Sequence, residues 1–378
     1  MRNETERDMT VETTAERALE QVLGFVRPAV RRQKPYLVGA VGAEPRVKLN
    51  QNESPYDLPA DLKQELAEAF AAIPFNRYPQ EQPWALRDAL AAYLGHDPDG
   101  LLVGNGSNEL TYTLGLALVA PGTPVVLPRP MFSLYESVVR MYDGALVSIP
   151  PLPDLRFDVD ALRAAVEQRD PALTVLTTPN NPTGLALPLE AVESIVQAAR
   201  GFVLVDEAYV EFTEEESAQT ILGRYPNLLL MRTMSKAFGL AGLRVGYLMG
   251  HPAVVAELFK ARVPFMTDRM AEVTALALLR RPELLRRTAA TIKAACRDLT
   301  GALQAMPEVE VVPSQANFVL FKTPLEPSQL MHRLAEAGVL VRNMGGYPEL
   351  RGYLRVNAGT PEENQAFLTA LKGALQPS

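Results

Sequence analysis

The sequence is poor in the residues that build disulfides and metal centres. It has one cysteine, Cys296, which cannot form a disulfide within the chain. The three histidines, His96, His251 and His332, are far apart, with no cysteine or carboxylate at metal-ligand spacing. We therefore expect neither a structural metal site nor histidine-based catalysis, and we predict no metal.

Long apolar runs and excess positive charge are also absent. No run approaches the ~20 apolar residues that a membrane helix needs, so we expect no membrane segment. The first 20 residues have neither the apolar centre of a signal peptide nor the composition of a transit peptide, which favours a cytoplasmic location. With 37 basic and 44 acidic residues the net charge is −7, so no global field attracts nucleic acid. An anionic substrate must be held by locally placed arginines.

What the chain does contain is a regular alternation of short apolar runs and helical patterns between about Asp61 and Met249. This pattern is typical of buried parallel strands covered by helices on both faces, an α/β fold. We predict one mostly parallel sheet of seven strands. The expected strands cover residues 101–104, 125–127, 145–149, 173–178, 202–206, 227–232 and 245–249.

The pattern changes after about Pro252, where helical segments fill the chain to 305 and are followed by short strands and two further helices. This indicates a smaller α+β domain. The stretch 31–59 is rich in Pro, Gly and Asn and is predicted to be an extended arm. The expected division is an N-terminal arm (1–58) that packs partly with the small domain, a large domain (59–265) and a small C-terminal domain (266–378).

Polar motifs follow three of the predicted strands, at the sheet edge where such folds bind ligands. In GNGSNE (104–109) the amides near Ser107 and Asn108 could bind a phosphate, although a capped helix start explains the motif equally well. TTPNNPTG (177–184) places Asn181 on a rigid turn. In DEAY, Asp206 ends a buried strand and needs a cation or donor, or else caps a helix, and Tyr209 follows it.

The most informative stretch is RTMSKAFGLAGLRVG (232–246). Lys236 lies among small and apolar residues, which favours a desolvated, nucleophilic amine over a surface lysine. Thr233, Ser235 and Arg244 flank it with groups suited to a phosphate. Arg342 and Arg355 occur within apolar strands of the small domain, where an arginine requires an anion, either a protein carboxylate or a substrate.

Together these groups meet the requirements of pyridoxal 5′-phosphate chemistry. Lys236 would form a Schiff base with the cofactor and then move the substrate proton, and Asp206 would keep the pyridine nitrogen protonated. Asn181 and Tyr209 would bind the phenolic oxygen, and Phe132 would stack on the ring unless it is simply a core residue. The predicted phosphate ligands are Ser107, Asn108, Thr233, Ser235 and Arg244.

Over nearly its whole length the chain resembles the fold type I aminotransferases, and within them the histidinol-phosphate aminotransferases. The resemblance rests on LNQNE, NRYPQ, PNNPTG, DEAYVEF, RTMSKAFGLAGLRVGY and LRVNAGTPEEN. It implies the cofactor roles above for Lys236, Asp206, Tyr209, Asn181 and Arg244. It also implies a homodimer with shared active sites, in which Tyr78 reaches the cofactor phosphate of the neighbouring subunit.

The resemblance further implies transfer of an amino group between L-histidinol phosphate and 2-oxoglutarate in histidine biosynthesis. Arg342 and Arg355 would bind the anionic ends of these substrates, and Tyr36 and Asn52 would line the pocket. Two alternatives stay open: an aromatic amino acid aminotransferase and a threonine-phosphate decarboxylase. A non-catalytic cofactor-binding regulator is disfavoured because no DNA-binding module is visible.

The sequence departs from the family pattern at three places. Met131 stands where the family often has Thr, and Phe132 stands where it often has Tyr. The segment MGGYPELRG (344–352) differs from the sequence usual in the family. Because this segment follows Arg342, it leaves the choice of substrate side chain open.

Overall fold

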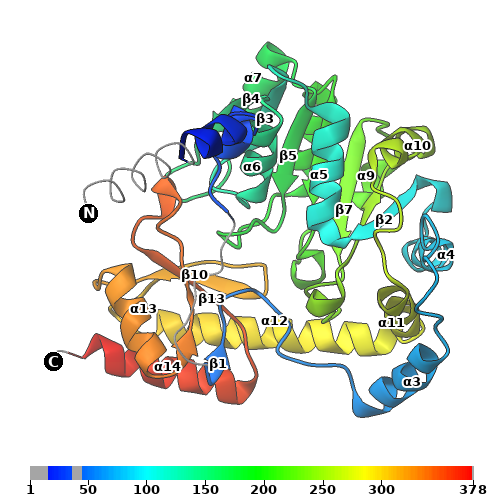
Figure 1. The fold of residues 1–378 in the computed structure, drawn as a ribbon. Helices are drawn as coiled ribbons and strands as arrows, with labels where there is room; N and C mark the ends of the chain where they lie inside the picture. Colours follow the sequence, from blue (N-terminus) through cyan, green and yellow to red (C-terminus); the bar gives the residue numbers. More distant parts are fainter. Residues whose placement is uncertain (1–15, 36–44, 377–378) are drawn as a thin grey trace, which may run out of the picture.

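The computed structural model describes residues 16–35 and 45–376. Its centre is a seven-stranded sheet in the order β2-β8-β7-β6-β5-β3-β4 (Figure 1). Every neighbouring pair is parallel except the two that involve β8, which runs against β2 and β7. The strands are β2 (Leu101–Asn105), β3 (Pro124–Pro128), β4 (Ala145–Ile149), β5 (Leu173–Thr177), β6 (Phe202–Asp206), β7 (Leu228–Thr233) and β8 (Val245–Met249).

The predicted seven-stranded, mostly parallel sheet is confirmed. Alternate residues of each inner strand enter apolar cores on opposite faces of the sheet: in β6, Val203 and Val205 face one core and Leu204 the other. Both faces are thus buried, which explains why the strands are continuous apolar runs in the sequence.

Helices cover both faces of this sheet. One core contains α3 (Ala60–Ala71), α4 (Trp84–Leu94), α7 (Val159–Arg169), α8 (Leu189–Ala198) and α11 (Arg269–Leu279). The other contains α5 (Gly106–Leu118), α6 (Leu134–Met141) and α10 (Pro252–Ala261). The short α9 (Gln219–Leu222) packs near β7.

The smaller unit has its own antiparallel sheet in the order β12-β13-β10-β9. Its strands are β9 (Glu310–Val312), β10 (Phe318–Lys322), β12 (Arg342–Asn343) and β13 (Tyr353–Asn357), and its helices are α13 (Pro327–Glu336) and α14 (Pro361–Leu375). Thr360 and Glu363 form a capping box that fixes the start of α14. In the arm, β1 (Val47–Lys48) pairs in parallel with β11 (Val339–Leu340), so the arm adds to the small unit.

One helix belongs to both units. α12 (Pro282–Gln304) places Leu285, Ala289 and Ile292 in the large core, and Cys296, Leu299 and Leu303 in the small core. Figure 1 shows it running along the large domain and beneath the small sheet. The boundary between the two apolar cores therefore falls within α12. The predicted domain boundary after residue 265 would instead assign both α11 and all of α12 to the small domain.

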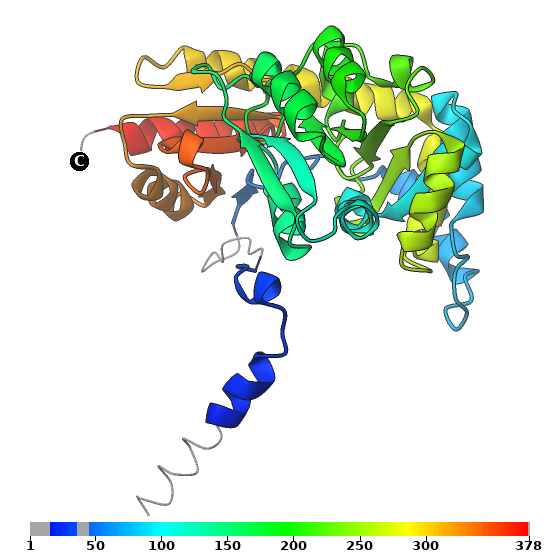
Figure 2. The ribbon, with the colours of Figure 1, turned by 90° about the horizontal axis from the view of Figure 1, so that it is seen from above.

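The N-terminal segment lies apart from both cores. Residues 16–23 are helical, and α2 (Pro28–Arg31) contacts α6, with Arg27 paired to Asp143 at 2.8 Å. Figure 2 shows the segment before α2 projecting away from the body.

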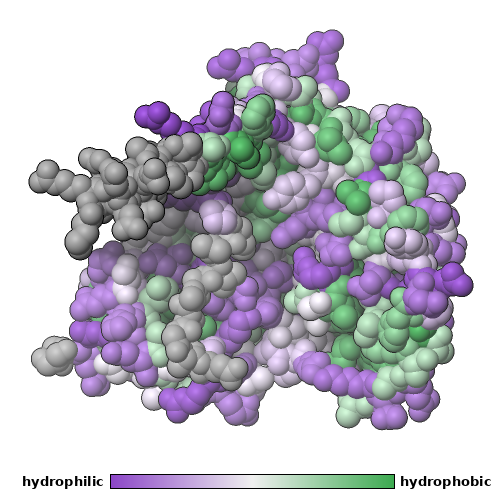
Figure 3. All heavy atoms as spheres, viewed as in Figure 1, coloured by the Kyte–Doolittle hydropathy of each residue, from purple (hydrophilic) through white to green (hydrophobic). Residues whose placement is uncertain are grey.

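The face in Figure 3 mixes hydrophilic and apolar residues. Among the described helices, none is both long enough and apolar enough to cross a membrane.

Candidate active site

A cavity of about 780 Å³ lies between the two units, where the carboxyl ends of β5, β6 and β7 face the strands of the small sheet. It is lined by all the predicted site residues that the structure describes, except Tyr78. They are Asn52, Ser107, Asn108, Phe132, Asn181, Asp206, Tyr209, Thr233, Ser235, Lys236, Arg244, Arg342 and Arg355. The fold thus brings residues from six separate motifs into one space.

Lys236 lies just after β7 and extends into the cavity. Its Nζ donates a hydrogen bond to the carbonyl oxygen of Gln51 at 3.1 Å and lies 5.9 Å from the ring centre of Tyr209. Burial, followed by repulsion from Arg355, lowers the pKa of the Lys236 amine to about 7. A large share of this amine is therefore neutral near pH 7, as a nucleophile or general base requires.

Asp206 ends β6 and is buried. Its carboxylate accepts hydrogen bonds from the hydroxyl of Tyr135 at 2.7 Å and from the amide of Ala208 at 3.0 Å. Burial raises the pKa of the Asp206 carboxyl to about 6, while the two donors oppose the shift. The predicted need for a strong donor is met by Tyr135, and the charged form remains available near neutral pH to hold a cationic group.

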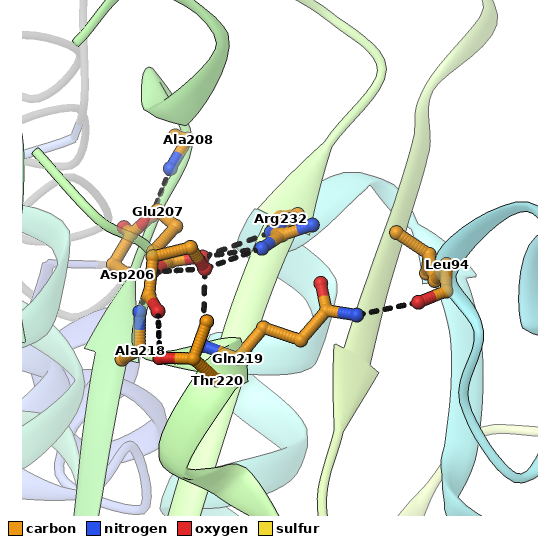
Figure 4. Close-up of polar contacts among 9 residues, drawn as sticks. Leu94, Asp206, Glu207, Ala208, Ala218, Gln219, Thr220 and Arg232 are labelled. Atoms are coloured by element: carbon orange, nitrogen blue, oxygen red, sulfur yellow. Dashed lines mark hydrogen bonds and ion pairs between the residues drawn. The ribbon is translucent and has the colours of Figure 1, made fainter. Parts of the chain in front are cut away.

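A buried ion pair lies beside Asp206. Glu207 binds Arg232 through Nε at 2.9 Å and Nη2 at 2.7 Å, and it also accepts bonds from the Ser217 hydroxyl and the Ala218 amide (Figure 4). Glu207 and Arg232 directly adjoin Asp206 and Thr233 in the chain. Because all their charges are satisfied internally, they fix the ends of β6 and β7 on which the cavity residues stand.

Tyr209 is positioned from the arm. Its hydroxyl accepts a hydrogen bond from Nδ2 of Asn52 at 2.9 Å. The backbone amide of Asn52 donates in turn to Oδ1 of Asn357 at 3.1 Å. Asn52 has a φ of 55°, a conformation that asparagine tolerates better than most residues. The arm, the large domain and the small sheet therefore meet at Tyr209.

The two small-domain arginines differ in their surroundings. Arg355 on β13 reaches across to Oδ1 of Asn181 and also donates to the carbonyl oxygen of Asn50 at 3.2 Å. Its guanidinium lies 5.1 Å from the ring centre of Phe318. Arg342 on β12 lines the same cavity, and its backbone pairs with that of Arg355 across the sheet. Both guanidinium groups are thus placed on the small-domain wall.

Two glycines leave room for a phosphate cradle beside the start of α5. Gly106 begins α5 with a φ of +74°, and a Cβ there would lie 2.4 Å from Nη2 of Arg244. A Cβ on Gly246 would lie 2.3 Å from the amide nitrogen of Ser107. Ser235 is fixed by bonds with Thr233 at 2.9 Å and Arg244 at 3.3 Å. A helix N-terminus, hydroxyls and a guanidinium converge here, which is the chemistry that binds phosphate.

These groups fit pyridoxal phosphate in three respects. A lysine amine with a lowered pKa, a buried carboxylate and a phosphate cradle lie around one cavity. Phe132 lines it as well and packs edge-on against Tyr135. Tyr135 was not predicted from the sequence, because a tyrosine within the apolar pattern of α6 looks like an ordinary core residue. Arg129, Glu136 and Tyr347 also line the cavity and were not singled out.

Two predicted site residues remain to be placed. Tyr36 lies outside the described residues. Tyr78 is 84% exposed and stacks on Phe265 with ring centres 5.1 Å apart. Its role at a neighbouring subunit stays a prediction.

Comparisons with known proteins agree with this geometry. The family model for aminotransferases of class I and II matches residues 44–371. A histidinol-phosphate aminotransferase of Chlorobaculum tepidum is 41% identical over 92% of this chain and 99% of its own length. One from Prosthecochloris aestuarii is 40% identical over 92% of this chain and 97% of its own length.

A solved structure extends the comparison to three dimensions. The histidinol-phosphate aminotransferase of Sinorhizobium meliloti, in complex with pyridoxal 5′-phosphate, superposes with a TM-score of 0.83. It is 25% identical, and the match covers 93% of this chain and 98% of that one. The chain therefore belongs to the aminotransferases of class I and II and, among them, to the histidinol-phosphate aminotransferase family.

Proposed function

We propose that the protein transfers the amino group of L-histidinol phosphate to 2-oxoglutarate, giving imidazole acetol phosphate and L-glutamate in histidine biosynthesis. The observation that carries this proposal is the charge of the cavity. Among the described residues, five cationic side chains line it besides Lys236, against three carboxylates: Lys34, Arg129, Arg244, Arg342 and Arg355 against Glu53, Glu136 and Asp206. In a chain of net charge −7, this local excess favours anionic ligands, and the cofactor and both substrates are anions.

Pyridoxal phosphate is the cofactor of this family, and when bound it supplies an acceptor for the electrons released at the substrate Cα. We assign the covalent attachment and the proton transfer at Cα to the Lys236 amine, whose pKa is lowered to about 7. Asp206 would hold the proton on the ring nitrogen of the bound cofactor, and Tyr209 and Asn181 would donate to its phenolic oxygen. Ser107, Asn108, Thr233, Ser235 and Arg244 bind the cofactor phosphate.

Arg355 and Arg342 are assigned to the anionic ends of the substrates. Both lie on the small-domain wall of the cavity, on paired strands. A substrate held by them would span the cavity with its amine toward Lys236. Each guanidinium offers a planar pair of donors, which suits both a phosphate and a carboxylate. One site could therefore accept both substrates in turn.

We further propose a homodimer in which Tyr78 completes the site of the neighbouring subunit. This proposal is supported by exposed apolar side chains on two neighbouring loops and on the first turn of α11. They are Phe75, Tyr78, Val263, Phe265 and Met270, at 37–84% exposure. Sedimentation should give twice the mass of the chain. Mixing the inactive Lys236→Ala and Tyr78→Ala variants should restore activity if sites are shared.

We also propose a cytoplasmic location, where buried Cys296 would stay reduced.

The deciding experiment is the absorbance spectrum of the purified protein before and after L-histidinol phosphate is added without an oxo acid. We expect a visible band from lysine-bound cofactor to be replaced by a near-ultraviolet band of the aminated cofactor. Phenylalanine and threonine phosphate serve as comparison substrates. A band that responds only to phenylalanine would assign an aromatic aminotransferase, and decarboxylation of threonine phosphate would assign a lyase. Lys236→Ala should lose the visible band while keeping the circular dichroism of the folded chain.

A further inference from the structure

An ion-pair cluster joins the two units at the cavity wall. Arg129, which follows β3 of the large domain, has its Nε 3.3 Å from Oε1 of Glu136 and 3.4 Å from Oε1 of Glu349. Glu136 lies on α6, and Glu349 lies in the short 3-10 helix η4 (Pro348–Leu350) of the small domain. Arg140 approaches the second oxygen of Glu136 at 3.6 Å. One guanidinium thus links carboxylates from both units.

The large-domain side of this cluster is firmly anchored. The backbone amide of Arg129 donates to the carbonyl oxygen of Ile149 at 2.8 Å, and the carbonyl of Pro130 accepts from Nδ2 of Asn180 at 2.9 Å. Asn180 is itself bonded to Thr177 and Thr183 within the PNNPTG turn. Arg129 therefore stands on the same rigid frame as Asn181.

The small-domain side is a loop that packs on a small apolar cluster of its own unit. The loop at residues 343–351 begins at the last residue of β12 and runs toward β13, and Gly345 and Gly346 lie near its start. The loop carries Asn343, Met344, Gly346 and Tyr347, all of which line the cavity next to Arg342. Its internal hydrogen bonds are short-range, from Tyr347 to Met344 and from Leu350 to Tyr347. Buried Met344 and Leu350 anchor its two ends in an apolar cluster.

Partial burial makes the link between these sides energetically relevant. The side chains of Arg129, Glu136 and Glu349 are only 18–28% exposed, so their charges are screened less than those of surface pairs. Oε2 of Glu349 is buried without a hydrogen-bond partner in the described structure. Loss of Arg129 would therefore leave a partly buried carboxylate without its cation, a costly arrangement.

We propose that the Arg129–Glu349 ion pair is a positioning device that holds the 343–351 loop over the cavity and thereby sets the affinity for the amino substrate. This inference rests on the proposed function for the identity of that substrate. It also gives a physical role to the segment MGGYPELRG, whose sequence departs from the family pattern. The pair touches neither the phosphate cradle nor Lys236, so cofactor binding should not depend on it.

The test is a double-mutant cycle on the full-length holoenzyme. Glu349→Gln and Arg129→Gln should each raise KM for histidinol phosphate about 2- to 30-fold, a range typical of residues that act through others. The fall in kcat should be smaller, and the visible cofactor band should stay unchanged. Arg129→Lys should rescue much of the loss, because it keeps the charge. The effects of the two Gln substitutions should not add in the double variant.

A matched control and a second measurement keep the result unambiguous. Glu193, which pairs with Arg224 at 3.0 Å and is 22% exposed, lies away from the cavity, so Glu193→Gln should leave KM unchanged. Hydrogen exchange of residues 343–351 should be faster in Glu349→Gln than in the wild type. Unchanged KM and unchanged exchange, or fully additive losses, would overturn the proposal.

The two hypotheses fail separately. If the wild type does not use histidinol phosphate, the proposed function fails. The exchange experiment and the KM for whichever amine the enzyme accepts then still decide the role of the ion pair. If the wild type uses histidinol phosphate and the variants match it, only the positioning role is refuted.

Discussion

The hydroxyl of Tyr135 stabilises the ionised form of Asp206 against the effect of burial, and removing it should shift the pH dependence of cofactor binding. The substitution Tyr135→Phe keeps the ring that packs against Phe132 and deletes one donor at 2.7 Å. A hydrogen bond to a charged group contributes about 1.5–3 kcal/mol. Since 1.36 kcal/mol corresponds to one pKa unit, the pKa of Asp206 should rise by about 1–2 units.

The consequence depends on pH in a defined direction. The carboxyl of Asp206 has its pKa raised to about 6 in the wild-type protein, so it is mostly ionised at pH 7 and binds a protonated ring nitrogen. In the variant the pKa should lie near 7–8, by the same hydrogen-bond arithmetic. Because ionised Asp206 favours the bound state, affinity is full above the pKa of the free protein and is lost as pH falls through it. At pH 6.5 the variant should bind about tenfold more weakly, and the two proteins should converge above pH 9.

The assay is a titration of cofactor-depleted protein with pyridoxal phosphate at several pH values, followed by absorbance. Expressing each result as the ratio of variant to wild-type Kd removes the ionisations of the free cofactor. Tyr225→Phe is a matched control, because it deletes a tyrosine bond to Glu193 of 2.6 Å far from the cavity. A ratio that is constant with pH would refute the assigned coupling between Tyr135 and Asp206.

Three further predictions concern neighbouring groups. Gly106→Ala forces a side chain toward Arg244 at a positive φ, so cofactor affinity should fall at least tenfold in an equilibrium titration, and an unchanged Kd would contradict the phosphate cradle. Glu207→Gln leaves Arg232 buried without its partner and should lower the free energy of unfolding by about 3–5 kcal/mol in urea denaturation; a loss below ~1 kcal/mol would show that the pair is dispensable. Because the pKa of the Lys236 amine is lowered to about 7 from 10.5, covalent attachment of the cofactor should accelerate as pH rises from 6 and level off above about 8 in stopped-flow absorbance. A rate still rising steeply at pH 10 would indicate an ordinary lysine.

The sequence predicted the sheet well because burial on both faces leaves a clear pattern. The expected strand at 202–206 matches β6, and that at 245–249 matches β8. Strand direction has no such pattern, and the antiparallel course of β8 came only from the structure. Residues on strand ends, such as Asp206, could be selected because polar groups there are costly unless they are used.

Long-range partners were harder to predict. Nothing in the apolar pattern of α6 distinguishes Tyr135, which bonds Asp206 from 71 positions away. The contact between Arg129 and Glu349 likewise spans the two units and depends on how they pack. Site residues can be identified from local motifs, whereas the groups that tune them depend on tertiary packing, which a single sequence does not reveal.

The course of α12 ties the mechanics of the two units together. Its first half is packed in one core and its second half in the other, and its backbone hydrogen bonds run without a break between them. A rotation of the small unit must therefore bend or tilt this 23-residue helix rather than flex a loop. Unfolding either core would strip half the helix of its packing, so heat should melt both units in one cooperative transition.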